Sequence, residues 1–376
     1  MRIVLAANAR MPTEWAHGVQ IAQMAEAFAR LGHEVELLVP DRPESRGQEV
    51  AAFYGLLDCF RVRRVSDLGA VHRRPLGQLP QRLSYVGAAL TRLAARQPDL
   101  LLSRDEVLAA LARPRALALY ELHKLPSRRL RVWAACARGA SGVVSTNSWK
   151  RELLVQRYGL DPARILVAPN GTDVERIQAA AALPLRERLG IASDTKLVLY
   201  AGHLHAWKGV EHLVAAAPLL PESVHIVVLG GRDEDLARFR AAHAGPRVHL
   251  PGPVPPAEVA GWLKAADLLV LPNIGTDPES RFQTSPLKLF EYMAAGRPIL
   301  ASDLPSVREV LDERCAWLVV PGSPAAIARA AQEALADPVE AARRAAAASV
   351  RVQGRSWSAR AQAILDFAAG LMGVTS

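Results

Sequence analysis

The segment with the clearest chemical potential is residues 284–303, which read TSPLKLFEYMAAGRPILASD. Ser285 is a favourable N-cap, Pro286 a favourable first helical residue, and Gly296 is placed to end the helix. The first N–H groups of a helix lack partners within it and carry a partial positive charge, so they suit a phosphate. Glu291 would lie two turns further on, within reach of a sugar hydroxyl. The segment predicts either a phosphate-binding helix with a carboxylate for a sugar, or a plain capped helix with an exposed Glu.

The segments around this helix alternate as they do in parallel α/β sheets. Apolar runs of strand length include residues 2–7, 34–40 and 196–201, and a helical period follows the first of them. Strand, helix and strand in this order favour parallel pairing with helices on both faces of the sheet. We therefore predict an α/β protein of two doubly wound, Rossmann-like halves, with ligand sites beyond the carboxyl ends of the strands.

The length of 376 residues is too great for one compact core, so two domains are expected. We place them at residues 1–175 and 176–355. Residues 356–376 are predicted to form a C-terminal helix that packs back toward the first domain.

The net charge of +9 arises from 46 Lys and Arg against 37 Asp and Glu, and the whole excess lies in residues 1–170. A basic half indicates an anionic partner, such as a phosphorylated acceptor or a lipid surface, or simply an Arg-rich composition that solvates helices. A nucleic-acid surface would need aromatic side chains among the basic ones. Aromatic residues make up only 5% of the chain, which argues against nucleic acid.

Several protein classes are excluded by what the sequence lacks. Three distant cysteines, Cys59, Cys136 and Cys315, cannot build a disulfide framework or a four-ligand zinc site. No apolar run approaches the roughly 20 residues that span a bilayer, and no signal peptide is recognised, so we expect a cytoplasmic protein. Neither G-x-G-x-x-G nor G-x-x-x-x-G-K-[ST] occurs, which removes the simplest dehydrogenase and P-loop interpretations.

Seven segments, in order, resemble the retaining GT-B glycosyltransferases of family 4, in a subgroup whose donor helix reads SPLKLFEYMA-x-G-x-P. Any one of them is weak evidence, but the ordered set covers nearly the whole chain. They are residues 8–32, 120–123 (YELH), 169–173 (PNGTD), 202–209 (GHLHAWKG), 267–272, 285–298 and 356–360 (SWSAR).

The resemblance implies a GT-B fold, with an acceptor-binding first domain facing a donor-binding second domain across a cleft. It further implies that a hexosyl group moves, with retention, from a nucleotide-diphosphate sugar to a hydroxyl of a glycan, lipid-linked or small-molecule acceptor. UDP or GDP would be the nucleotide, and neither a cofactor nor a metal ion is expected. The basic first domain would suit peripheral contact with the inner face of a membrane.

Residues of the second domain match the family's donor-binding positions. Lys208 matches the lysine that contacts the donor diphosphate. His203 stands where many members have Arg, which weakens one phosphate contact or makes it pH-sensitive. Glu291 matches the second Glu of an E-x7-E pair and would hold the nucleotide ribose. The N–H groups of Ser285, Leu287 and Lys288 would face phosphate.

Three further positions either depart from the family pattern or have a structural alternative. Gln283 stands where the pair has its first Glu, so it can hydrogen-bond the sugar but brings no negative charge. His123 matches the histidine beneath the donor sugar; a structural His is the alternative. Gly18 matches a glycine of the first loop that lets the backbone approach the substrate, and a plain glycine at a helix N-terminus is its alternative.

Two rival functions remain open at this level. A sugar-nucleotide 2-epimerase of the same architecture would need further carboxylates for proton transfer, and the sequence offers no clear candidates. A family member that has lost catalysis and acts as a binding partner is the other rival, and it is motivated by Gln283 and His203.

Overall fold

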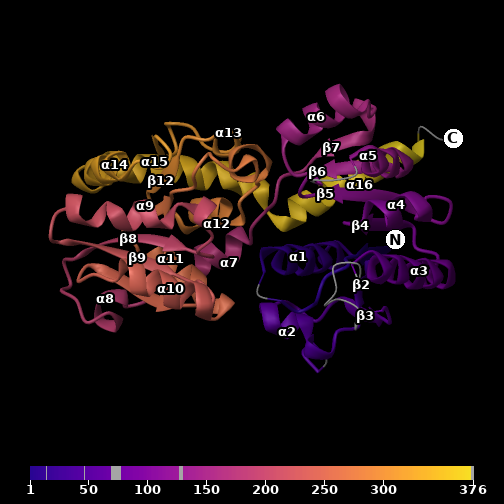
Figure 1. Ribbon diagram of the computed structural model, residues 1–376, viewed down its shortest axis with the longest axis horizontal. Helices are drawn as coiled ribbons and strands as arrows, with labels where there is room; N and C mark the ends of the chain where they lie inside the picture. Colours follow the sequence, from indigo (N-terminus) through magenta and orange to yellow (C-terminus); the bar gives the residue numbers. More distant parts are fainter. Residues whose placement is uncertain (14, 46, 69–77, 127–129, 374–376) are drawn as a thin grey trace. The chain divides into compact units, whose positions relative to one another are not determined.

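The computed structural model describes residues 1–13, 15–45, 47–68, 78–126 and 130–373. Their contacts divide the chain into two compact units. The first comprises Met1–Asn170 and Trp357–Ser376, and the second comprises Gly171–Ser356. Each unit is built around its own parallel sheet with helices on both faces (Figure 1). The predicted α/β class with two doubly wound sheets is confirmed.

In the described part of the first unit, seven parallel strands form the sheet. In spatial order they are β3 (Arg61–Val65), β2 (Glu34–Pro40), β1 (Arg2–Ala6), β4 (Leu100–Ser103), β5 (Leu117–Leu122), β6 (Gly142–Ser145) and β7 (Ile165–Val167). The helices are α1 (Ala16–Arg30), α2 (Val50–Tyr54), α3 (Gln78–Arg96), α4 (Glu106–Ala112), α5 (Leu130–Gly139), α6 (Ser148–Tyr158) and α16 (Trp357–Gly373).

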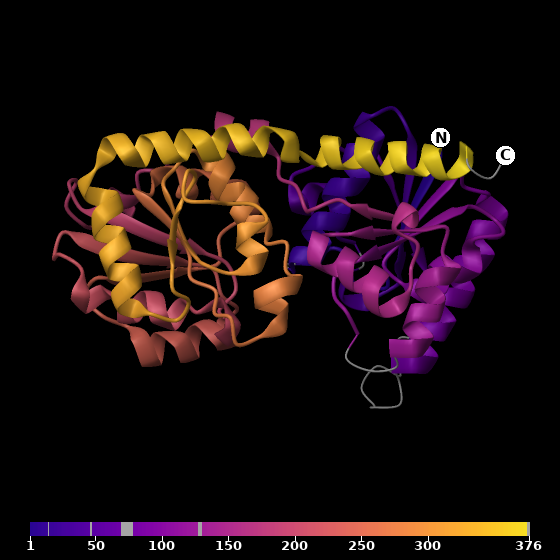
Figure 2. The same ribbon diagram turned by 90° about the horizontal axis from the view of Figure 1, so that it is seen from above.

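The last helix, α16, is part of the first unit although the whole second unit precedes it in sequence. It packs on α1 and runs beside the sheet (Figure 2). At the start of β6, a Cβ added to Gly142 would lie 2.8 Å from Leu371 and 3.0 Å from Phe367, so the helix sits directly against the strand.

In the second unit, the described residues form a sheet of six parallel strands. In spatial order they are β10 (Val248–Gly252), β9 (Val224–Leu229), β8 (Lys196–Ala201), β11 (Leu268–Leu271), β12 (Ile299–Ser302) and β13 (Trp317–Val319). The helices are α7 (Val174–Ala179), α8 (Leu185–Arg188), α9 (Val210–Ala215), α10 (Asp233–His243), α11 (Pro256–Ala265), α12 (Leu287–Ala295), α13 (Pro305–Arg308), α14 (Pro324–Ala336) and α15 (Pro338–Val352).

Strand β8 illustrates why these strands read as continuous apolar runs. Leu197 and Leu199 join the core on one face of the sheet, and Val198 and Tyr200 join the core on the other. Successive side chains of a strand point to opposite faces, so a strand buried on both faces has no polar position. Helix α12 contributes Phe290 to the first of these cores.

Strand β3 was missed by the sequence analysis. It reads RVRRV and forms the edge of the sheet, where most of its side chains remain partly or fully exposed. An edge strand with charged residues resists pairing with other chains, but it carries no apolar signal. Within the described residues, no helix is long and apolar enough to cross a membrane.

The close approach of Gly209 to the backbone after β11 gives a testable prediction. Gly209 and Gly190 have φ of +64° and +66°. A Cβ on Gly209 would lie 2.2 Å from the carbonyl oxygen of Pro272, whereas nothing lies within 4 Å at Gly190. We expect Gly190→Ala to cost about 1–2 kcal/mol of unfolding free energy, from φ alone. Gly209→Ala should cost about 2 kcal/mol more, since the loop must also move.

Urea denaturation of the two variants measures this difference. Equal costs would mean that the loop at Gly209 yields freely and does not hold the preceding residue, Lys208, in place.

Candidate functional site

A glycine at the carboxyl end of β8 brings two distant parts of the second unit together. Gly202 has φ of +139°, and a Cβ there would lie 1.7 Å from Nζ of Lys288, which comes from the first turn of α12. The amide of Gly202 donates to the carbonyl of Leu229 at 2.7 Å, and that of Gly231 donates to the carbonyl of Gly202 at 3.0 Å. The loops after β8 and β9 are thus joined, the positive φ of Gly202 favours glycine, and any larger residue would displace the end of the Lys288 side chain. We call residues 202–209 together with Lys288 the cationic site.

Lys208 is the first charged group of the cationic site. It ends a short 3-10 turn, Ala206–Lys208, and its Nζ lies 3.7 Å from the ring centroid of Trp207. The side chain is half-buried, and loss of hydration lowers the pKa of Lys208 to about 7, against a smaller opposing effect of Glu279. No hydrogen bond or ion pair joins the ammonium to another described residue. A ligand anion would restore its charge.

Lys288 is the second charged group, and its side chain was not considered in the sequence analysis, which used only its backbone N–H. Its Nζ donates to Oη of Tyr200 at 2.9 Å and lies 4.2 Å from the centroid of that ring. Burial, with the nearby charge of Lys208, holds the pKa of Lys288 well below its usual range, while Glu291 opposes the shift. The sequence did contain a signal for a partly buried lysine, because Lys288 stands among the apolar residues Leu287, Leu289 and Phe290.

His203 behaves differently from the expectation of a titrating phosphate contact. Burial and then the charge of Lys288 lower the pKa of His203 to about 4. Its ring stacks on His205 with centroids 5.6 Å apart. Without a bound anion the imidazole is therefore neutral at physiological pH, and the positive charge here comes from the lysines.

The start of α12 differs from the sequence prediction by one residue. The helix begins at Leu287, and Pro286 occupies the N-cap position with extended backbone, φ −72° and ψ 116°. Pro286, rather than Ser285, is therefore the N-cap, since the first helical residue is Leu287. The amide of Leu289 donates to the carbonyl of Pro286 at 3.0 Å, which leaves the N–H groups of Leu287 and Lys288 without helical acceptors.

Two polar side chains flank this helix start. Glu291 is half-buried on α12, and no hydrogen bond joins its carboxylate to another described residue. Burial raises the pKa of Glu291, and Lys288 opposes this shift. Gln283 is half-buried at the end of a π-helical turn, Glu279–Gln283, two residues before Ser285.

In the first unit, His123 follows β5 and contacts a buried carboxylate. Its Nε2 lies 3.0 Å from Oε2 of Glu121. Its carbonyl oxygen accepts a hydrogen bond from Nζ of the buried Lys150 at 3.0 Å. Burial and the charge of Arg104 outweigh Glu121 and lower the pKa of His123 to about 3. The ring is thus neutral, with Nε2 beside Glu121, and the backbone of the residue is held by Lys150.

Glu121 is the centre of a network that links four elements of the first unit. One carboxylate oxygen accepts from Arg360 on α16 at 2.7 Å and from Gln20 on α1 at 2.9 Å; the other accepts from Arg104 after β4 at 3.1 Å. Burial alone would raise the pKa of Glu121, but the contact with His123 and the charges of Arg360 and Arg104 hold it well below its usual range. We call Gln20, Arg104, Glu121, His123 and Arg360 the Glu121 network.

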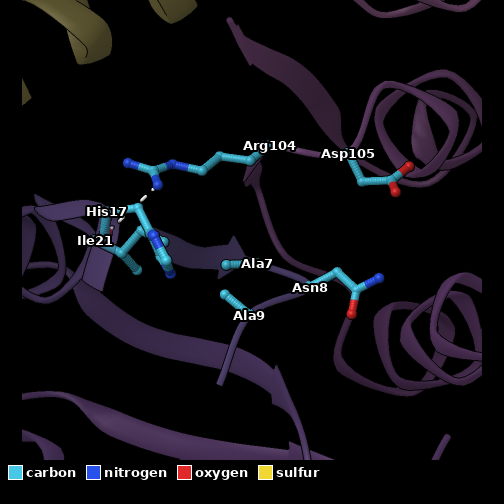
Figure 3. A pocket seen from close by; sticks show the side chains of 7 residues that line it. All are labelled: Ala7, Asn8, Ala9, His17, Ile21, Arg104 and Asp105. Carbon is cyan, nitrogen blue, oxygen red and sulfur yellow. Dashed lines mark hydrogen bonds between the residues drawn. The ribbon is translucent and has the colours of Figure 1, made fainter. Parts of the chain in front are cut away.

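A pocket of about 270 Å³ opens beside this network, at the carboxyl ends of β1 and β4. Figure 3 shows Asn8 and Arg104 on separate loops, with His17 and Ile21 contributed by α1. The Arg104 guanidinium donates to the carbonyl of His17 at 3.3 Å. The sequence analysis missed Arg104, although its place directly after an apolar run expected to be a strand was a usable signal.

Gly18 lies in the first turn of α1, where the need for glycine has a local cause. A Cβ there would lie 2.3 Å from Oη of Tyr54 and 2.5 Å from Cγ2 of Thr13. Packing alone therefore requires glycine, and a contact of Gly18 with substrate rests on the resemblance. Gly18 and His123 belong to the first unit, and the other residues singled out from the sequence belong to the second.

Comparison with known families gives matches in both units. A model described as Glycosyltransferase Family 4 matches residues 17–176, and one described as Glycosyl transferases group 1 matches residues 195–337. Together they cover more than half of the chain.

Two named relatives match at different extents. A D-inositol 3-phosphate glycosyltransferase of Xylanimonas cellulosilytica is 34% identical over 241 residues, which cover 60% of this chain and 56% of that protein. The chain thus spans little more than half the length of this relative. A phosphatidyl-myo-inositol mannosyltransferase of Mycobacterium leprae is 28% identical over 367 residues, covering 93% of this chain and 91% of that protein.

Solved structures share the fold. HepE of Anabaena, determined with UDP-glucose, superposes with a TM-score of 0.75 at 20% identity, covering 98% of this chain and 100% of that one. A sucrose-phosphate synthase of Thermosynechococcus elongatus gives 0.78 at 21% identity, covering 99% of both chains. These likenesses establish the two-domain GT-B architecture.

The Glu121 network predicts a large cost for removing its central charge. Glu121→Gln would leave Arg104 and Arg360 without their carboxylate, so we expect a loss of about 3–5 kcal/mol in the unfolding free energy of the first unit. Glu34→Gln is the matched control, because Glu34 pairs with Arg96 at the surface and should cost under about 1 kcal/mol. Urea denaturation measures both, and equal losses would contradict a structural role for the network.

Proposed function

Since the chain belongs to glycosyltransferase family 4, we propose that it transfers a hexosyl group from a nucleotide-diphosphate sugar to an acceptor hydroxyl, with retention of configuration. The observation that carries this proposal is the cationic site. Its lysines lie beside the N-terminus of α12, whose first N–H groups have no acceptor in the helix. Clustered donors of this kind suit a diphosphate.

The donor would lie along the loop after β8 and the start of α12. Lys208 would contact the diphosphate, and the N–H groups near Ser285 and Leu287 would add to it. Glu291, whose carboxylate has no hydrogen-bond partner among described residues, would accept hydrogen bonds from two ribose hydroxyls. His203 would act as a neutral hydrogen-bonding group. UDP and GDP are the nucleotides proposed.

The reaction would rely mainly on stabilising the departing diphosphate. The bond from the anomeric carbon to the phosphate oxygen breaks, and a bond to the acceptor oxygen forms on the same face of the sugar. The acceptor proton passes to the departing phosphate oxygen, so no strong protein base is needed. Fixed cationic groups and N–H groups act on the charge that develops there. In this scheme no metal ion and no cofactor take part.

Gln283 and His123 are proposed to contact the transferred sugar. Gln283 would hydrogen-bond a sugar hydroxyl through its side-chain amide. His123, neutral and fixed by Glu121, would orient the sugar from the first unit.

The acceptor is proposed to bind the first unit at the pocket lined by Asn8, His17 and Arg104. The relatives of Xylanimonas cellulosilytica and Mycobacterium leprae are named for inositol 3-phosphate and for phosphatidyl-myo-inositol. A hydroxyl-rich acceptor, whether a glycan, a lipid-linked sugar or a small molecule, is the class we propose. The enzyme would act in the cytoplasm, with its basic first unit able to meet an anionic membrane surface.

A nucleotide-binding panel tests the donor site. The purified protein is titrated with UDP, GDP, ADP and dTDP by calorimetry, and one nucleotide class should bind saturably. Lys208→Ala should weaken that binding about tenfold to 100-fold, because a charge-assisted contact is lost. Lys196→Ala is the control, since Lys196 lies at the other end of β8 with half its side chain exposed, and it should bind as the unmodified chain does.

Turnover separates the proposal from its rivals. A transferase consumes the sugar nucleotide only with an acceptor and yields a product of the same anomeric configuration, as read by NMR. A 2-epimerase would convert the donor without any acceptor. Tight nucleotide binding without either reaction would overturn the catalytic proposal and favour the lapsed enzyme that Gln283 suggests.

A further inference from the structure

Lys288 is the only long charged side chain in the first turn of α12, and it does not extend into solvent. It is half-buried and lies over Tyr200, whose hydroxyl accepts from its Nζ at 2.9 Å. The same hydroxyl donates to the carbonyl of His203 at 2.6 Å. The ammonium is therefore anchored by a neutral group and held beside the loop after β8.

The loop is shaped to accommodate this ammonium. Any side chain at Gly202 would occupy the position of Nζ and Cε of Lys288, at 1.7 and 2.1 Å from an added Cβ. The positive φ of Gly202, +139°, also excludes other residues. The backbone of the loop and the ammonium of α12 are thus brought within contact of each other.

The charges around Lys288 are not balanced. Its titratable neighbours are Lys208, Glu291, Tyr200, His203 and His205. No ion pair joins Lys288 to a carboxylate of the described residues. Two lysines that share a poorly hydrated region repel each other and lower the stability of the empty site. An anion with two negative groups would neutralise both of them.

We propose that Lys288 is a second donor-binding lysine, whose ammonium contacts the diphosphate of the nucleotide sugar together with that of Lys208. This inference rests on the proposed function and extends it to a side chain that neither the sequence motifs nor the relatives assign. Tyr200 is the positioning residue, because its hydroxyl holds the ammonium at the loop when no ligand is bound.

A consequence of this arrangement is proton uptake on binding. Burial lowers the pKa of both lysines, and that of Lys208 falls to about 7, so Lys208 is partly deprotonated in the empty site near neutral pH. A bound diphosphate favours the charged form and raises these pKa values. Binding therefore takes up protons, and affinity should rise as the pH falls from about 9 to about 7.

The experiment compares the unmodified chain with Lys288→Met and with Lys196→Met as control, using calorimetric titration with UDP and GDP. Titrations in Hepes and in Tris, which differ in ionisation heat, give the number of protons taken up. We expect Lys288→Met to weaken binding about tenfold to 100-fold and to reduce proton uptake. Lys196→Met should leave both unchanged, and thermal unfolding checks that each variant is folded.

The possible results distinguish a failure of this inference from a failure of the proposed function. If a nucleotide binds the unmodified chain and Lys288→Met binds it equally well with equal proton uptake, Lys288 is a packing residue and the inference fails while the proposed function stands. If neither UDP nor GDP binds the unmodified chain, the proposed donor site itself fails and the inference falls with it.

Discussion

The central physical constraint in this protein is the burial of two lysines beside one loop, where loss of hydration disfavours their charged forms. Lys208 and Lys288 come from segments far apart in sequence, the end of Lys288 lies against the backbone at Gly202, and the charge of Lys208 acts on it there. Such an arrangement destabilises the empty site, since both ammonium groups lose hydration without gaining a carboxylate. The parallel sheet, the glycines after β8 and β9, and the buried face of α12 together hold this arrangement in place.

In the first unit, by contrast, the buried carboxylate of Glu121 is balanced by positively charged side chains. Glu121 lies among Arg104, Arg360 and His123, and these groups hold its carboxylate ionised against the effect of burial. Arg360 makes α16 part of this balance, so the last helix of the chain helps to fix the end of β5 where His123 stands.

Much of this fold could be predicted from sequence, because strands buried on both faces appear as apolar runs. Strand β3 could not be predicted in this way, since an edge strand that reads RVRRV is not an apolar run. At the site, Lys208 and Glu291 stand in local motifs, but the contact of Arg360 with Glu121 joins residues 239 apart, and no local pattern records it. The side chain of Lys288 was overlooked because its direction depends on Tyr200 and Gly202, which belong to another element. The N-cap prediction for Ser285 was wrong by one residue, because Pro286 itself has the extended backbone of the N-cap.

The most direct test of the account is hydrogen exchange, measured by mass spectrometry, with and without the nucleotide diphosphate that binds. In the proposed complex the diphosphate lies against the backbone of residues 202–209 and at the start of α12. Amides in these two segments should therefore exchange more slowly in the complex. Unchanged exchange in both segments at saturating nucleotide, with protection elsewhere, would show that the diphosphate binds at another place and would contradict the central claim.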